Sequence, residues 1–236
     1  MKKISLVMLV LVMSLSQACK GKTSKKEIVK ETVIEKNDPI QVVNNDAVFK
    51  NLDQALSPFE DLTEYALAKN ADGIKKSLSQ IDKASKNNVF TDNLKPESIK
   101  GLNEKIATLK NYFKRKDYAK TALTSADIFN YNVSNFKDAS KVENQIKIEH
   151  LDYLGFKILA LIAQKNIDWK TIEQTTKSVQ QVWKSLKTNV KDPNLKGSFD
   201  LLFDGIHLSA KEKNKKMATI FANMVLDLVD VLENTF

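Results

Sequence analysis

Residues 169–190 read WKTIEQTTKSVQQVWKSLKTNV, and apolar side chains recur in this stretch three or four residues apart. They form one stripe with a single polar interruption, made of Trp169, Ile172, Thr176, Val179, Trp183, Leu186 and Val190. This spacing puts the stripe on one face of an α-helix, whereas a half-buried strand would alternate apolar and polar residues. The stretch therefore predicts an amphipathic helix that buries one side.

The same spacing recurs through most of the chain, and no segment alternates with a period of two. Glycine and proline are sparse, with six and four residues in 236, which also favours helix. Short connections between helices make neighbours run antiparallel. We therefore expect an all-α protein, an antiparallel bundle of about eight helices. The expected helices cover residues 58–70, 71–86, 97–115, 117–136, 145–165, 168–190, 194–209 and 212–235, with a short helical turn near 47–56.

Several helix starts carry recognisable capping residues. The stretch Ser57-Pro58-Phe59-Glu60 fits a capping box, with proline at the first helical position and glutamate three residues after the cap. Asp72, Asp117 and Asp168 each stand where a following helix is expected to begin, where a carboxylate can accept backbone N–H bonds. These residues set the boundaries of the expected helices.

Landmarks in the connections suggest an internal duplication. Three pairs repeat at an offset of 96 or 97 residues: 69–72 with 165–168, Pro96 with Pro193, and Asp117 with Asn214. Helical hairpins of ordinary length could also reuse the same turn residues by chance. We predict two related four-helix units, residues 46–140 and 141–236.

The helix at 145–165 should lie between the two units. Its segment 153–163 holds one charged residue in eleven, and a helix that is apolar on nearly all faces is buried on nearly all faces. Gly155 would permit a close approach by a neighbouring helix. We expect this helix to pack against both units and to join them into one body.

The N-terminus has the layout of a secretory signal peptide, residues 1–18. Lys2 and Lys3 precede an apolar run of about a dozen residues, shorter than the roughly 20 that a membrane-spanning helix needs. The run ends in Leu15-Ser16-Gln17-Ala18-Cys19, which resembles the lipobox of bacterial lipoproteins over residues 1–19. That resemblance implies that Cys19 becomes the first mature residue and carries a diacylglycerol, holding the protein at a bacterial membrane, facing the periplasm or the outer envelope. Alternatively, ordinary signal peptidase cuts before an incidental cysteine, or the thiol pairs with another chain.

Residues 19–45 are rich in lysine and glutamate and are expected to form a flexible tether. Lys2 and Lys3 carry two of the formal net charge of +8, and residues 20–36 carry a net three, which leaves +3 on residues 37–236. That part also holds one arginine, Arg115, so nucleic acid is not an expected partner. Lysines beside a lipid anchor can instead add attraction to anionic headgroups.

No catalytic motif or cofactor motif is present, so we expect a protein that is not an enzyme, binds no cofactor and holds no metal. His150 and His207 are the only imidazoles, and Cys19 is the only thiol. Gly205-Ile206-His207 resembles the start of the G-x-H-x-x-E signature of imelysin-like periplasmic proteins, which is linked to metal binding. Ala210 stands where that signature has glutamate.

One helix face suggests a binding surface. The helix at 117–136 is unusually rich in amides, and the candidate residues are Asp127, Asn130, Tyr131, Asn132 and Asn135. The favoured function is a lipid-anchored, non-enzymatic module of the cell envelope that binds another envelope protein. The alternative is a periplasmic helical protein that binds a metal or a small molecule, which predicts polar side chains clustered in a cavity between helices.

Overall fold

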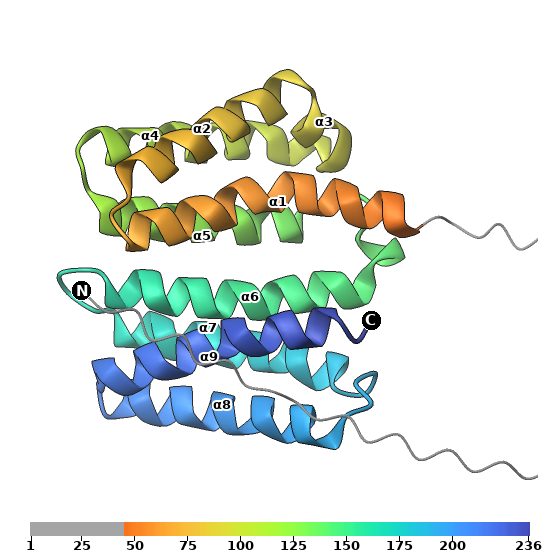
Figure 1. Cartoon of the computed structure of the whole chain (residues 1–236), viewed down its shortest axis with the longest axis vertical. Coiled ribbons are helices and arrows are strands. Elements are labelled where there is room, and N and C mark those ends of the chain that lie inside the picture. The colour runs from red at the N-terminus through yellow and green to blue at the C-terminus, as the bar shows by residue number, and fades with distance from the viewer. Residues whose placement is uncertain (1–44) are drawn as a thin grey trace, which may run out of the picture. The chain divides into compact units, whose positions relative to one another are not determined.

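The computed structural model describes residues 45–236, most of which lie in helices (Figure 1). The elements are α1 (Asn45–Leu67), α2 (Ala71–Lys86), α3 (Val89–Asn93), the 3-10 helix η1 (Pro96–Ser98), α4 (Ile99–Lys114), α5 (Tyr118–Ser134), the 3-10 helix η2 (Ala139–Lys141), α6 (Glu143–Ile162), α7 (Trp169–Leu186), α8 (Pro193–Lys211) and α9 (Lys215–Glu233). No strand occurs in residues 45–236, which confirms the all-α helical bundle. The predicted signal peptide, Cys19 and all but the last residue of the predicted tether lie outside the described residues.

Five helices begin at an asparagine or aspartate whose side-chain oxygen accepts a hydrogen bond from a backbone N–H two or three residues ahead. These caps are Asn70, Asp117, Asp168, Asp192 and Asn214. Each such cap typically contributes about 1 kcal/mol to stability. The predictions for Asp117 and Asp168 are confirmed. Asp72 lies in the first turn of α2, as predicted, but the cap of that helix is Asn70, and Asp72 pairs with Lys75.

Three connections share one turn, in which a lysine adopts a left-handed backbone. Lys69, Lys116 and Lys213 have φ angles of 55°, 58° and 52°. In each turn the lysine N–H bonds to the carbonyl three residues back, and the next N–H bonds to the carbonyl five residues back. This Schellman motif closes one helix, and the residue after the lysine caps the next. The hairpins α1–α2, α4–α5 and α8–α9 are therefore tight and antiparallel.

Helix α1 is one continuous helix, so the predicted break at Ser57-Pro58 is wrong. Pro58 lies inside α1 and is buried, although proline in a helix interior removes one backbone hydrogen bond. The apolar stripe runs through it, and α5 donates side-chain hydrogen bonds to two nearby carbonyls: Asn132 Nδ2 to Ala55 O at 3.0 Å and Ser125 Oγ to Phe59 O at 2.7 Å. Packing against α5 thus supports a helix that the local sequence would interrupt.

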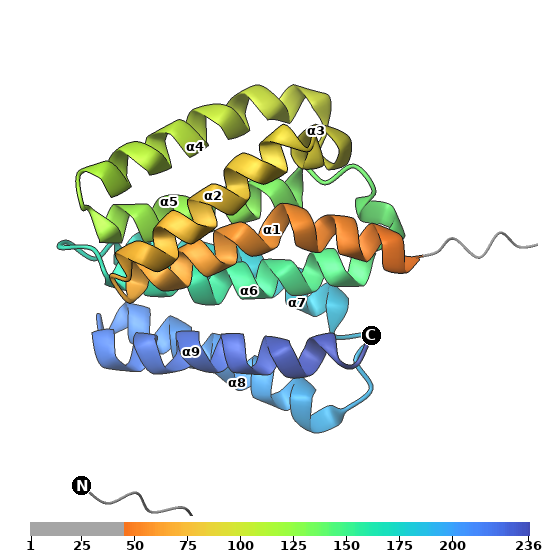
Figure 2. The same cartoon turned by 45° about the horizontal axis from the view of Figure 1, so that its top comes forward.

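Helix α6 lies between the two halves of the bundle, as Figures 1 and 2 show, and packs against α1, α5, α7 and α9. This confirms its expected position. A Cβ atom on Gly155 would lie 2.5 Å from Leu226 Cδ2 and 3.1 Å from the Ala222 carbonyl, so glycine permits the close approach of α9. No helix of the described residues combines the length and the apolar character needed to cross a membrane.

The buried apolar residues form two clusters, one on each side of α6. One cluster is drawn mainly from α1 to α5, and the other comes from α6 to α9. In both halves the first helix packs against the second and the last, and the third packs against the last. The halves differ because α3 packs beside α1 and α2 in the first, whereas α7 and α8 pack directly in the second. The duplication itself stays a prediction.

Candidate functional site

Carboxylates from three helices gather where α1, α6 and α9 meet. We call this the acidic groove and define it by eight side chains that line two neighbouring hollows: Glu60, Asp61, Glu64, Glu149, Asp152, Asp227, Asp230 and Glu233. Glu60 and Glu64 are four residues apart, and the groove carboxylates of α6 and α9 recur every three residues, so each of these sets lies along one face, with Asp61 next to Glu60. The packing of α6 against α1 and α9 brings the three faces together.

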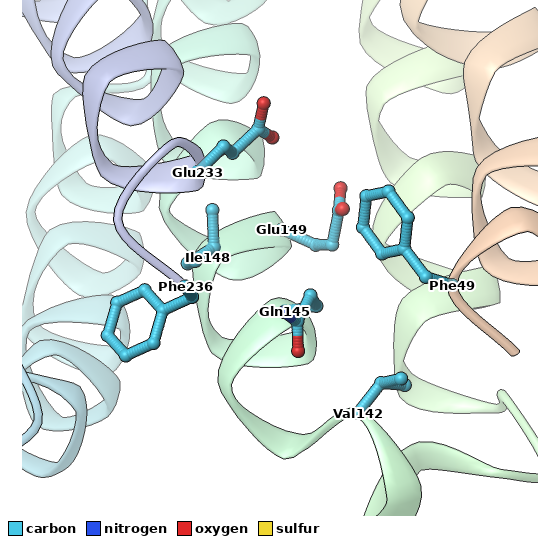
Figure 3. Close-up of a pocket in the computed structure, with 7 residues that line it drawn as sticks. All are labelled: Phe49, Val142, Gln145, Ile148, Glu149, Glu233 and Phe236. Atoms are coloured by element: carbon cyan, nitrogen blue, oxygen red, sulfur yellow. The ribbon is translucent and has the colours of Figure 1, made fainter. Parts of the chain in front are cut away.

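The first hollow has a volume of about 310 Å³ and lies near the C-terminal end of α9. Figure 3 shows Glu149 projecting from α6, with its carboxylate and that of Glu233 directed into the same open space. Phe49 borders that space on the side of α1, and Phe236 lines it near the chain end. The hollow therefore combines an apolar rim with two carboxylates.

The second hollow, of about 380 Å³, holds six of the groove carboxylates, Glu60 and Asp152 among them. Between the two hollows, one oxygen atom each from Glu60, Glu149 and Asp152 lies within 4.8 Å of the others. We call these three residues the carboxylate cluster. It forms the floor of the groove, because Glu149 and Asp152 are only 8% and 7% exposed.

The carboxylate cluster carries an unfavourable charge distribution. Burial is the main reason that the pKa of Glu60 rises to about 7 and that the pKa values of Glu149 and Asp152 rise well above the usual range. The negative charge of Glu60 raises the pKa of Glu149 further, and those of Glu233 and Asp53 add to this. The one hydrogen bond in the cluster runs from Asp152 to Glu60, which raises the pKa of the donor and lowers that of the acceptor.

No cationic side chain of residues 45–236 pairs with the groove. Eight ion pairs form among these residues, and each of them uses a carboxylate outside the groove. A buried carboxylate without a counter-charge is costly unless it takes up a proton or a cation. The arrangement can therefore bind a cation, and its all-oxygen donor set suits hard cations such as Ca²⁺ or Mg²⁺.

The five residues predicted to form a binding surface on α5 do not share one surface. Asn132 is fully buried and donates to α1, and Tyr131 OH donates to the Ser98 carbonyl at 2.9 Å. Asn135 Nδ2 donates to the Tyr131 carbonyl within α5. The description of an exposed amide-rich face is thus wrong for Asn132, whose side chain helps to hold α1 against α5.

The other two residues of that set face α6. Asp127 accepts a bond from Lys157 Nζ at 2.5 Å and one from Tyr153 OH at 3.4 Å. Asn130 Oδ1 lies 2.9 Å from His150 Nδ1, at the edge of a separate hollow of about 470 Å³. Helix packing uses the polar atoms of both residues.

The two histidines occupy different places. His150 of α6 pairs with Asn130 of α5, whereas His207 of α8 lies 3.5 Å from Gln180 Oε1 of α7. Neither belongs to the carboxylate cluster, and Cys19, the predicted lipid attachment site, lies outside the described residues.

An apolar patch lies on α8 and α9. Leu201 is 72% exposed and lines a mainly apolar hollow of about 450 Å³ with Phe221, Met224 and Leu228. Exposed apolar groups of this kind are typical of surfaces that contact another molecule.

Sequence reasoning missed the acidic groove. A signal was present in α6, where Glu149 and Asp152 interrupt the most apolar helix three residues apart. Charged residues are rarely buried without a partner, so two of them on a helix expected to be buried all round indicate a polar site. Their partners on α1 and α9 lie far away in the sequence and match no motif.

Comparison with known proteins assigns no relative to this chain. It matches no protein-family model, and neither a curated protein nor a solved structure matches it.

Proposed function

We propose that this protein is a non-enzymatic binding module of the bacterial cell envelope, which takes up a cationic ligand in the acidic groove. The observation that carries the proposal is the set of eight carboxylates in one groove without an ion pair among residues 45–236. This favours ligand binding over the protein–protein interaction first expected from the sequence, because the polar groups line hollows between helices.

The proposal includes a tether at the membrane. Lipid on Cys19 would hold the module there, with the lysine-rich segment after it acting as the spacer. Intact-mass measurement of the chain from a membrane fraction tests this part. We expect a chain that begins at Cys19 and carries a diacylglyceryl group, whereas an unmodified thiol at that residue would contradict the anchor.

Ligand uptake is tested by thermal unfolding of the full-length chain in detergent with CaCl₂, MgCl₂, spermidine or a lysine-rich peptide. A ligand that binds only the native state raises the Tm by mass action. We expect at least one of these cations to raise the Tm, and sodium chloride at equal ionic strength serves as the control for screening. A Tm that responds to none of them beyond that control would overturn the proposal.

The apolar patch around Leu201 supports the second function considered, binding to an envelope protein. This patch adjoins the acidic groove on α9, since Asp227 lines both, while Leu201 belongs to the patch alone. Replacing Leu201 with serine should leave the response to cations unchanged if the two surfaces act separately.

A further inference from the structure

The floor of the acidic groove is small, deeply buried and made only of oxygen donors. We infer that Glu60, Glu149 and Asp152 coordinate a hard divalent cation of the Ca²⁺ type. The inference rests on the proposed function and narrows it, since it selects a metal ion over an organic cation.

Distances support coordination by all three residues. One oxygen from each lies within 4.8 Å of the others. Ca²⁺ binds oxygens at about 2.3–2.6 Å, so two oxygens on opposite sides of the ion stand about 4.8 Å apart. Mg²⁺ binds oxygens at about 2.1 Å and demands near-octahedral geometry, whereas Ca²⁺ accepts irregular arrangements of six to eight oxygens. Three carboxylates held by two different helices suit the ion that tolerates irregular geometry.

An independent observation points to a ligand at this place. Glu149 is only 8% exposed, and no ion pair or side-chain hydrogen bond found within residues 45–236 uses its carboxylate. Figure 3 shows its carboxylate directed into the open space of the first hollow, and an oxygen each from Glu60 and Asp152 lies within 4.8 Å of it. The Glu149 oxygens are not among the fully enclosed atoms that lack a hydrogen-bond partner, so they face the hollow, where a cation can reach them. Because the described chain supplies no counter-charge there, a bound cation would stabilise this carboxylate.

Size separates a metal ion from an organic cation. Glu149 and Asp152 lie at the floor, more than nine-tenths buried, where a small sphere fits more readily than a polyamine chain. The exposed carboxylates Asp227 and Asp230 lie on the outer wall, where a longer cation would bind. The hollows on either side leave room for water to complete the six to eight ligands that Ca²⁺ takes.

The charges are consistent with a divalent ion. Coordination by all three residues requires Asp152 to release the proton that it donates to Glu60. The three ionised carboxylates then carry a formal −3, which a divalent cation reduces to −1. Glu233 and Asp53 lie near enough to act on Glu149 by their charge, and so they favour a cation at the floor further.

Isothermal titration of the full-length chain with CaCl₂ at pH 7.5, after removal of metals with EDTA, tests the inference. We expect one Ca²⁺ per chain, a higher Tm in Ca²⁺ than in EDTA, and weaker binding of Mg²⁺. Glu149→Gln keeps the shape of the side chain and should weaken Ca²⁺ binding at least tenfold. Glu143→Gln, on the same helix but in an exposed pair with Lys147, should bind as the wild type does.

The outcomes distinguish this inference from the proposed function. If Ca²⁺ and Mg²⁺ do not bind while spermidine raises the Tm, the metal site is wrong and the cation-binding groove stands. If no cation binds, both are wrong. Unfolding of Glu149→Gln in EDTA checks that the variant folds, and Asp152→Asn provides a second variant. Unchanged Ca²⁺ binding in both folded variants would overturn the site.

Discussion

Two edges of α6 treat buried charge in opposite ways. On the edge that faces α5, Lys157 is only 10% exposed and pairs with Asp127, and His150 is paired with Asn130. On the edge that faces α1 and α9, Glu149 and Asp152 are equally buried and have no cationic partner among residues 45–236. The fold of the described residues thus supplies a counter-charge for the buried Lys157 on one edge of α6 but none for Glu149 and Asp152 on the other. The acidic edge retains an unfavourable arrangement, which is typical of binding sites.

We call the α5-facing edge of α6, with the pairs Lys157–Asp127 and His150–Asn130, the paired edge, and the α1- and α9-facing edge with Glu149 and Asp152 the acidic edge. The largest effect should come from removing the Lys157–Asp127 ion pair. Asp127→Ala leaves the Lys157 ammonium buried without its counter-charge, which should destabilise the protein by about 3 kcal/mol. Urea unfolding followed by circular dichroism measures the change. The double variant Asp127→Ala with Lys157→Met should recover most of the loss, because it removes the unpaired charge. A double variant no more stable than the single one would contradict this explanation.

The acidic edge should make stability fall as the pH rises. The pKa of Glu60 is raised from 4.5 to about 7 in the folded state. The folded protein therefore holds this proton more tightly than the unfolded chain does. The resulting stabilisation is complete below pH 4.5 and is lost as the pH rises through 7. The linkage between proton binding and folding then predicts a loss of about 2 kcal/mol between pH 5 and pH 7 from this one group.

This pH dependence is measured by urea unfolding in EDTA. Burial lowers the pKa of His150, which acts in the opposite direction over the same range, so the wild-type slope reports the balance of the two. Glu60→Gln should flatten or reverse the slope, whereas Glu143→Gln should leave it unchanged. A wild-type stability that rises steadily from pH 5 to pH 7 would show that the paired edge dominates.

Neutralising the acidic edge should stabilise the metal-free protein. Glu149→Gln removes a buried carboxylate without a partner, and we expect a gain of about 1.5 kcal/mol at pH 8 in EDTA. The sign is opposite to that of Asp127→Ala, although both changes remove one negative charge next to α6. Urea unfolding measures it, and a loss of stability would show that Glu149 has a partner in the native protein.

The smallest effect should come from the neutral pair on the α5 side. Asn130→Ala removes the hydrogen-bond partner of His150, which should cost about 1 kcal/mol. Thermal unfolding at pH 8, where the imidazole is neutral, measures the loss. An unchanged Tm would mean that water replaces the amide at this position.

Much of the fold could be predicted because local interactions define it. The stripe from Trp169 to Val190 predicted α7, and the caps Asp117 and Asp168 fixed two helix starts. The break at Pro58 was predicted wrongly because α5 side chains support α1 from outside, which no local pattern reports. Helix α3 was missed for a similar reason, since its five residues are too few to show a period.

The candidate site was beyond the reach of sequence patterns. Asp127 and Asn130 looked like parts of a binding surface, because an amide-rich helix face is the same in sequence whether it meets solvent or another helix. The residues of the acidic groove were instead overlooked, because Glu60, Glu149 and Glu233 each resemble an ordinary exposed charged residue when the sequence of their helix is read alone.

The sequence by itself determined the helical class, most helix boundaries and the central place of α6, because hydrogen bonds, caps and apolar spacing act over a few residues. Only the tertiary structure decided which charges meet. Helix packing places Glu60 beside residues some 90 positions later in the chain, and burial there changes three ordinary carboxylates into a cluster that lacks a counter-charge among the described residues. Whether a carboxylate is exposed or belongs to such a cluster depends on its distance from other charges and on its loss of contact with water. Both are properties of the folded protein and not of any single segment.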